Sequence, residues 1–374
     1  MSDLFYLSQV AVVSATLLYF SRKSKYLQLQ ILCWSLLTSI LALRYGVIGQ
    51  RIFYSNDQQY HAELIEEIVA NGLPIDVDWW LQRARVPYVL PATALALAGI
   101  DPLLALKVVS LLSMLTLTSE IQRTIPSTSL PRFQITSFMT STAFVGIFFS
   151  ALGLRETTMM LFVYWFFLGT NPAKKYGSLL CLVLLRPHLA VAVLLGSLPS
   201  AIGRKLPATS FSTPIRNFAW LMSGPLIGYY LYAIGLQYQT GLAGIYGHSW
   251  GIQPVLRIAS NFVGLQFLTA NELSLGFSLR SLLILRVFFS ETVLIPLCFT
   301  IAVLLARQPS RLMRSVVLSF GMYIGIATNT DFNSFRQNIP FMPVMGLIVL
   351  LAWRERRQPV APPRVLTTTA LRGM

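Results

Sequence analysis

Long apolar segments recur along almost the whole chain, and the short loops between them carry Lys or Arg. Hydrophobic residues make up 55% of the 374 residues, charged residues make up only 11%, and the mean hydropathy is +0.62. A water-soluble domain needs far more surface charge, whereas apolar stretches of about 20 residues match the thickness of a bilayer. The sequence therefore predicts an all-α polytopic membrane protein.

The charges of the short loops predict how the chain crosses the membrane. Residues 21–25 carry only basic charges, so the positive-inside rule places them in the cytoplasm and the N-terminus outside. Basic loops recur further along the chain and predict about eleven crossings. These crossings form a single domain over residues 1–353, with outer loops at 50–85 and 239–285. Residues 354–374 are expected to be a basic, disordered cytoplasmic tail.

Three segments do not have the pattern of a single membrane-spanning helix. Residues 60–69 have an amphipathic pattern that predicts a helix lying on the membrane surface. Residues 86–119 are interrupted at Gly99-Ile100-Asp101-Pro102, where Asp and Pro mark a turn or a helix start. Residues 177–200 are scarcely long enough for two spans, so they predict two short helices that meet at Arg186-Pro187-His188, because Pro disfavours helical geometry before it.

Several classes of ligand are not expected. The net charge of +15 is spread over loops rather than along one stripe, so it does not predict nucleic-acid binding. The cysteines lie inside separate apolar runs and form no disulfide or zinc pattern. Asp76-Val77-Asp78 resembles an Asp-x-Asp metal signature, yet it precedes Trp79-Trp80, which is typical of an interfacial helix. We therefore predict no metal and no cofactor.

Several arginines lie on the predicted outer side, against the positive-inside bias. The planar guanidinium group matches phosphate oxygens in a two-point contact and keeps its charge. These residues therefore predict a ligand that carries phosphate, such as a lipid-linked sugar. They are Arg51, Arg83, Arg85, Arg155, Arg257 and Arg336.

Four short elements follow one another along the chain. They are Arg44-Tyr45 followed by Gly46 and Asp57-x-x-Tyr60; Leu154-Arg155-Glu156; Lys174-Lys175 through Arg186-Pro187-His188; and Phe335-Arg336-Gln337-Asn338-Ile339-Pro340-Phe341. In this order they resemble the EpsG-type branch of polysaccharide (O-antigen) polymerases. The outer element Asp57-x-x-Tyr60-His61 also resembles the first-loop acid of the GT-C class of glycosyltransferases, which use lipid-linked donors.

The resemblance implies a GT-C-like fold and glycosyl transfer at the outer face of a bacterial inner membrane. The donor would be a polyprenyl-(pyro)phosphate-linked sugar or oligosaccharide, and the acceptor a glycan, as in O-antigen polymerisation. Membrane lipid and envelope polysaccharide assembly proteins are the other expected partners. Two alternatives remain: a GT-C enzyme that transfers a single sugar, and a transporter or flippase of lipid-linked sugars. A non-catalytic scaffold of an envelope complex is a third.

The candidate site residues follow from this chemistry and from the matched elements. Asp57 is the first candidate for the base that activates the acceptor hydroxyl, and His188 and Glu156 are the other catalytic candidates. Each has an ordinary explanation as well, since Asp57 can cap a helix and His188 can be hydrogen-bonded in a core. The expected substrate-binding residues are Arg44, Arg51, Tyr60, His61, Arg155, Arg186 and Arg336.

Overall fold

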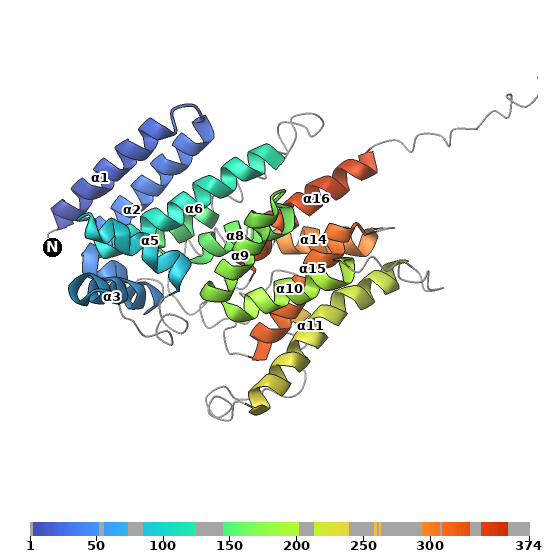
Figure 1. The fold of residues 1–374 in the computed structure, drawn as a ribbon. Coiled ribbons are helices and arrows are strands. Elements are labelled where there is room, and N and C mark those ends of the chain that lie inside the picture. The colour runs from blue at the N-terminus through green and yellow to red at the C-terminus, as the bar shows by residue number, and fades with distance from the viewer. Residues whose placement is uncertain are drawn as a thin grey trace, which may run out of the picture.

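The computed structural model describes residues 3–51, 56–73, 85–124, 145–201, 213–238, 258–259, 262, 294–306, 309–329 and 338–357. Within these ranges every regular element is a helix (Figure 1), which confirms the predicted all-α class. The predicted outer loop 239–285, apart from three residues, and residues 358–374 of the predicted tail lie outside the described residues.

Three of the described helices are long and apolar enough to cross a membrane. They are α1 (Asp3–Phe20), the Lys25–Val47 part of α2 (Lys25–Arg51), and α6 (Pro102–Thr124). The first two lie side by side as an antiparallel pair (Figure 1). The larger count of about eleven crossings stays a prediction.

The interruption predicted after residue 98 separates α5 (Val86–Leu97) from α6. Gly99 has φ +91°, a left-handed backbone that favours glycine. Asp101 then caps α6, because its Oδ1 accepts hydrogen bonds from the backbone N of Leu103 at 2.9 Å and of Leu104 at 3.1 Å. The local sequence therefore determines where one helix ends and the next begins.

The predicted amphipathic helix is present as α3 (Asn56–Asn71). Ile65 and Ile68 on its apolar side are buried, and Glu63 and Glu66 on the other side are exposed. The apolar side packs against α5 and α6, so protein covers the face that we expected to lie on the membrane surface. The helix itself is confirmed, and protein rather than lipid covers its apolar face; its position at the membrane surface stays a prediction.

The two short helices predicted around Arg186 are confirmed. The α8 helix (Glu156–Leu168) is followed by α9 (Pro172–Leu185), and α10 (Pro187–Ala201) begins after a single residue. Arg186 has an extended backbone with φ −159°, as the proline that follows it requires.

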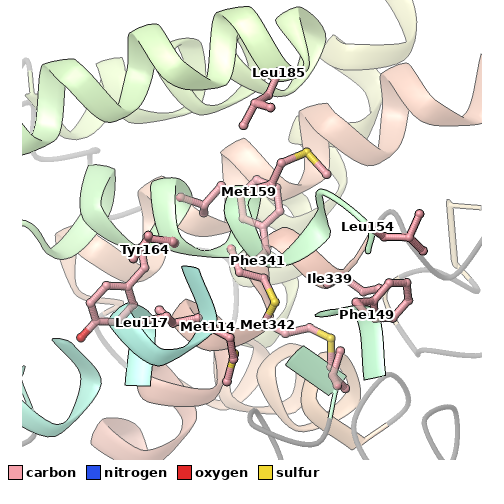
Figure 2. Packing of buried hydrophobic residues seen from close by; sticks show 14 of the residues in the cluster. Met114, Leu117, Phe149, Leu154, Met159, Tyr164, Leu185, Ile339, Phe341 and Met342 are labelled. Carbon is pink, nitrogen blue, oxygen red and sulfur yellow. The ribbon is translucent and has the colours of Figure 1, made fainter. Parts of the chain in front are cut away.

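A dense apolar core joins the first half of the chain to its C-terminal part. The short 3-10 turn η5 (Ile339–Phe341) packs against α8, and the first residues of α16 (Met342–Arg357) are buried beside it (Figure 2). Segments almost 200 residues apart in sequence therefore share one core. Figure 2 labels Met114, Leu117, Phe149, Leu154, Met159, Tyr164, Leu185, Ile339, Phe341 and Met342.

Glycines allow α11 (Thr213–Tyr238) and α15 (Arg311–Asn329) to approach until their backbones touch. Gly224 and Gly228 form a Gly-x-x-x-Gly motif, and Gly321 and Gly325 form a second one opposite it. A Cβ atom added to Gly325 would lie 2.1 Å from the backbone oxygen of Pro225. The helix α14 (Leu294–Leu305) packs against α11 and α16.

The helices of the first half end at two opposite sides of the helical body. At one side, Asp3 Oδ1 accepts a hydrogen bond from the Val47 backbone N at 3.1 Å. At the other, Lys174 Nζ lies 2.8 Å from Glu120 Oε1. We call the first the site end and the second the basic end. The exposed cations of the basic end are Arg22, Lys23, Arg123, Lys174 and Lys175.

Candidate functional site

Three arginines from different parts of the chain come together beside the turn that Ser110 of α6 holds. Arg85 immediately precedes α5, Arg155 immediately precedes α8, and Arg186 follows α9. Their positive charges act on one another: Arg186 and Arg85 both act on Arg155, and Arg186 acts on Arg85. The carboxylate of Asp57, from the first turn of α3, acts on Arg85 and Arg155. We call these three arginines the arginine cluster.

The turn that carries Arg155 is fixed by three different helices. Each of its three carbonyl groups at residues 152–154 accepts a hydrogen bond from a side chain of α3, α5 or α6. A buried carbonyl without a partner costs about 1–3 kcal/mol, so these bonds hold the turn in one conformation. The bonds run from Gln58 Nε2 to Leu152 O, from Tyr88 Oη to Gly153 O at 2.6 Å, and from Ser110 Oγ to Leu154 O at 2.8 Å.

Gly153 makes this turn sterically feasible. Its φ is +71°, and the backbone N of Leu154 donates to Phe149 O at 3.1 Å, which closes the preceding helical segment in the manner of a Schellman motif. A Cβ atom at position 153 would also lie 3.1 Å from Lys107 Cγ. Glycine is therefore required both by the backbone conformation and by the close approach of α6.

Arg155 occupies an unfavourable electrostatic position. Burial, followed by the charges of Arg186 and Arg85, lowers its pKa to about 10. Its Nε atom is buried and has no hydrogen-bond partner among the described residues. The carboxylate of Glu156, which is 1% exposed, partly offsets these charges. The Nε–H group of Arg155 can therefore donate a hydrogen bond to an anion that enters the cluster.

Arg85 has the only left-handed backbone among the described non-glycine residues, with φ 43° and ψ 51°. This conformation is costly for a residue with a Cβ atom, by about 1–3 kcal/mol, and such strain concentrates at functional sites. Burial lowers the pKa of Arg85, Arg186 lowers it further, and the phenol of Tyr60 and the carboxylate of Asp57 act in the opposite direction. The backbone and the charge of Arg85 therefore both work against stability.

Arg186 is held by its own neighbours. Its Nε donates to His188 Nε2 at 3.0 Å, and its Cζ lies 5.7 Å from the centre of the Tyr323 ring. The His188 ring stacks on the same tyrosine, with 5.8 Å between the ring centres and 8° between the planes. Tyr323 comes from α15 and is fully buried.

The structure does not bring every expected site residue into the cluster. Tyr60 lies beside Arg85 and is 44% exposed, whereas His61 is buried between the rings of Tyr60 and Tyr88. Arg44 is exposed on α2, where it lies over Tyr45 at 5.9 Å. Nothing is described of the Arg51 side chain, and Arg336 lies outside the described residues.

Several residues of the site were not expected from the sequence. Arg85 was expected on the outer side but was not placed among the site residues. Tyr88 and Ser110 are ordinary residues of apolar helices, and only their bonds to the turn give them a role. Tyr323 is separated from Arg186 by more than a hundred residues, so no local pattern connects the two.

Among the described residues, no group of three His, Cys, Asp or Glu side chains could hold a metal ion. Comparisons with protein-family models, curated proteins and solved structures found no match to this chain. Chemical inference therefore depends on the geometry of the cluster, which combines three cations, two carboxylates and an exposed phenol. This set can bind a multiply charged anion and can accept a proton beside it.

Proposed function

We propose that the chain transfers a glycosyl group from a polyprenyl-(pyro)phosphate-linked donor to an acceptor glycan, in the manner of a polysaccharide polymerase. The observation that carries this proposal is the convergence of Arg85, Arg155 and Arg186 with Asp57. Like charges repel, and the carboxylates of Asp57 and Glu156 balance only two of the three guanidinium charges, so a bound anion would stabilise the cluster.

The arginine cluster would bind the phosphate groups of the donor. In the reaction, the acceptor oxygen forms a bond to the anomeric carbon while the bond from that carbon to the phosphate oxygen breaks. The leaving group is the lipid (pyro)phosphate, which departs as an anion and needs charge stabilisation more than it needs a proton. A rigid turn, fixed at residues 152–154, lets Arg155 supply that stabilisation with little reorganisation.

The acceptor hydroxyl loses a proton in the same reaction, and Asp57 is the candidate that receives it. Asp57 is partly exposed, as a base that meets a substrate must be, and it lies on the first turn of α3 next to the cluster. Glu156 is buried beside Arg155, so it is better suited to balancing charge than to contacting an acceptor.

A transporter of lipid-linked sugars is the alternative, and it would bind its substrate near the middle of the membrane, between helices that are broken there. Arg85 and Arg155 precede α5 and α8, and Arg186 stands in the break between α9 and α10. Side chains of three helices fix the turn of Arg155, and this rigidity favours an enzyme, because a transporter has to rearrange its binding site in every cycle.

The test is the length of surface glycans in a strain that lacks this chain and is complemented with variants. Wild type should restore long chains, whereas Asp57→Asn and Arg155→Met should leave single repeat units and accumulate the lipid-linked donor. Arg123→Met, which removes an exposed arginine at the basic end, is the matched control and should behave as wild type. If deletion leaves both the glycans and the lipid-linked intermediates unchanged, the proposal is wrong.

A further inference from the structure

The hydrogen bond between Arg186 and His188 limits what each residue can do. A neutral imidazole has one nitrogen that accepts and one that donates. The accepting nitrogen, Nε2, is occupied by Arg186 Nε at 3.0 Å. Burial first, and then the positive charges of all three cluster arginines, lower the pKa of His188 and so oppose protonation of its ring. His188 therefore acts as the hydrogen-bond acceptor for the Arg186 guanidinium.

Tyr323 supports both members of this pair. Its ring lies parallel to His188, and the Arg186 guanidinium lies over the same ring. Tyr323 also contacts Phe341 of the buried C-terminal turn, with 5.8 Å between the ring centres. Both partners of the arginine side chain, an acceptor and an aromatic ring, are thus fixed by packed helices.

The position of Tyr323 depends on how α15 is held. Ser319, one turn earlier, donates to Val193 O of α10 at 3.2 Å, and a Cβ atom at Gly196 would lie 2.3 Å from Ser319 Oγ. The other side of α15 touches α11 at the glycine crossing. Contacts of α15 with α10 and α11 therefore fix the tyrosine ring on which the Arg186 guanidinium lies.

We propose that His188 and Tyr323 are positioning residues that hold Arg186 in the arginine cluster, and that His188 is not the base of the reaction. This inference rests on the proposed function only for its meaning in catalysis. The inference itself is that the two residues hold a guanidinium group that binds an anion. Anion binding can be measured without any turnover.

The experiment compares conservative and non-conservative variants at both positions. In His188→Gln the amide oxygen can still accept from Arg186 but cannot act as a base, whereas His188→Ala removes the acceptor. Tyr323→Phe keeps the ring, whereas Tyr323→Leu removes it. The probe is inorganic pyrophosphate, and its affinity is read from the thermal stabilisation of the purified chain in detergent.

We expect His188→Gln and Tyr323→Phe to bind pyrophosphate as wild type does. His188→Ala and Tyr323→Leu should bind it at least about tenfold more weakly, because Arg186 loses a charge-assisted bond or its support. In the glycan assay, the two conservative variants should restore long chains. Unfolding temperature and elution volume without pyrophosphate show whether each variant has folded.

Two results would overturn the inference. One is equal pyrophosphate affinity in all four folded variants, which would mean that neither residue positions Arg186. The other is loss of glycan extension in His188→Gln to the level of His188→Ala with normal pyrophosphate affinity, which would make His188 the base. Failure of the proposed function is recognised separately, because pyrophosphate binding would still follow the expected order while deletion leaves the glycans unchanged.

Discussion

At the scale of single residues, Arg155 should lower the stability of the empty protein. It is half-buried, its pKa is lowered to about 10 by burial and by two neighbouring arginines, and its Nε has no described hydrogen-bond partner. The folded protein therefore holds this positive charge less favourably than the unfolded chain does, in which water surrounds the guanidinium group. The charged side chain thus destabilises the fold throughout the neutral pH range.

We predict that Arg155→Met raises the unfolding temperature of the pyrophosphate-free protein. Methionine keeps the apolar stem and removes the charge, and relief of such a buried charge contributes on the order of 1 kcal/mol or more. The same variant should lose most of the stabilisation that pyrophosphate gives to wild type. Thermal unfolding in detergent measures both effects, with Arg123→Met as the control. A lower unfolding temperature with unchanged pyrophosphate binding would contradict this prediction.

How far single residues could be predicted depends on the signal that each one carries. Asp57, Arg155, Arg186 and His188 stand in short motifs, and the structure brings all four to one place. Arg85 was expected only as one of several outer arginines, and its left-handed backbone could not be predicted, because that conformation is a product of the surrounding structure. The exact roles of the four remain predictions.

At the scale of elements, the crossing of α11 and α15 connects packing to the site. Gly224, Gly228, Gly321 and Gly325 let the two backbones touch, and Tyr323 stands between the last two of them in sequence. Any side chain at this crossing must push the helices apart, because the neighbouring atoms belong to backbone and cannot rotate away.

We predict that Gly325→Val reduces folded protein and glycan extension together. The Cβ atom would start 2.1 Å from Pro225 O, so α15 has to move and take Tyr323 with it. Gly177→Ala is the matched control, since a Cβ atom there meets nothing within 4 Å. The yield of monodisperse protein and the glycan assay measure the two effects. Normal yield and normal glycans in Gly325→Val would show that this crossing is not closely packed.

Helix boundaries were easier to predict than helix partners. The helix breaks at Gly99–Pro102 and at Arg186–Pro187 follow from local backbone preferences, and both predicted breaks are confirmed. The partner of α3 could not be predicted in this way, because an amphipathic pattern shows that a face is covered but not whether lipid or protein covers it. The Gly-x-x-x-Gly pairs were a readable signal for the crossing of α11 and α15.

At the scale of the whole molecule, the arginine cluster and the exposed cations of the short connections lie at different places along the described helices. The arginine cluster and Asp57 lie beside the turn that Ser110 of α6 holds, whereas the exposed lysines and arginines of the short connections lie at the basic end. Cytoplasmic loops of membrane proteins carry the excess of Lys and Arg. If the three candidate spans cross a bilayer, the same rule that orients the basic end inward directs the site end outward.

We predict that the site end faces the extracytoplasmic side, which single-cysteine labelling can test. In a background where Cys33, Cys181 and Cys298 are replaced by Ala, Glu67→Cys on the exposed side of α3 should react with a membrane-impermeant maleimide in intact spheroplasts. Arg123→Cys at the basic end should react only after permeabilisation, because the positive-inside rule predicts a cytoplasmic position for it. The reverse pattern would place the arginine cluster inside and contradict transfer at the outer face, whereas the expected pattern would leave lipid-linked donors on that face within its reach.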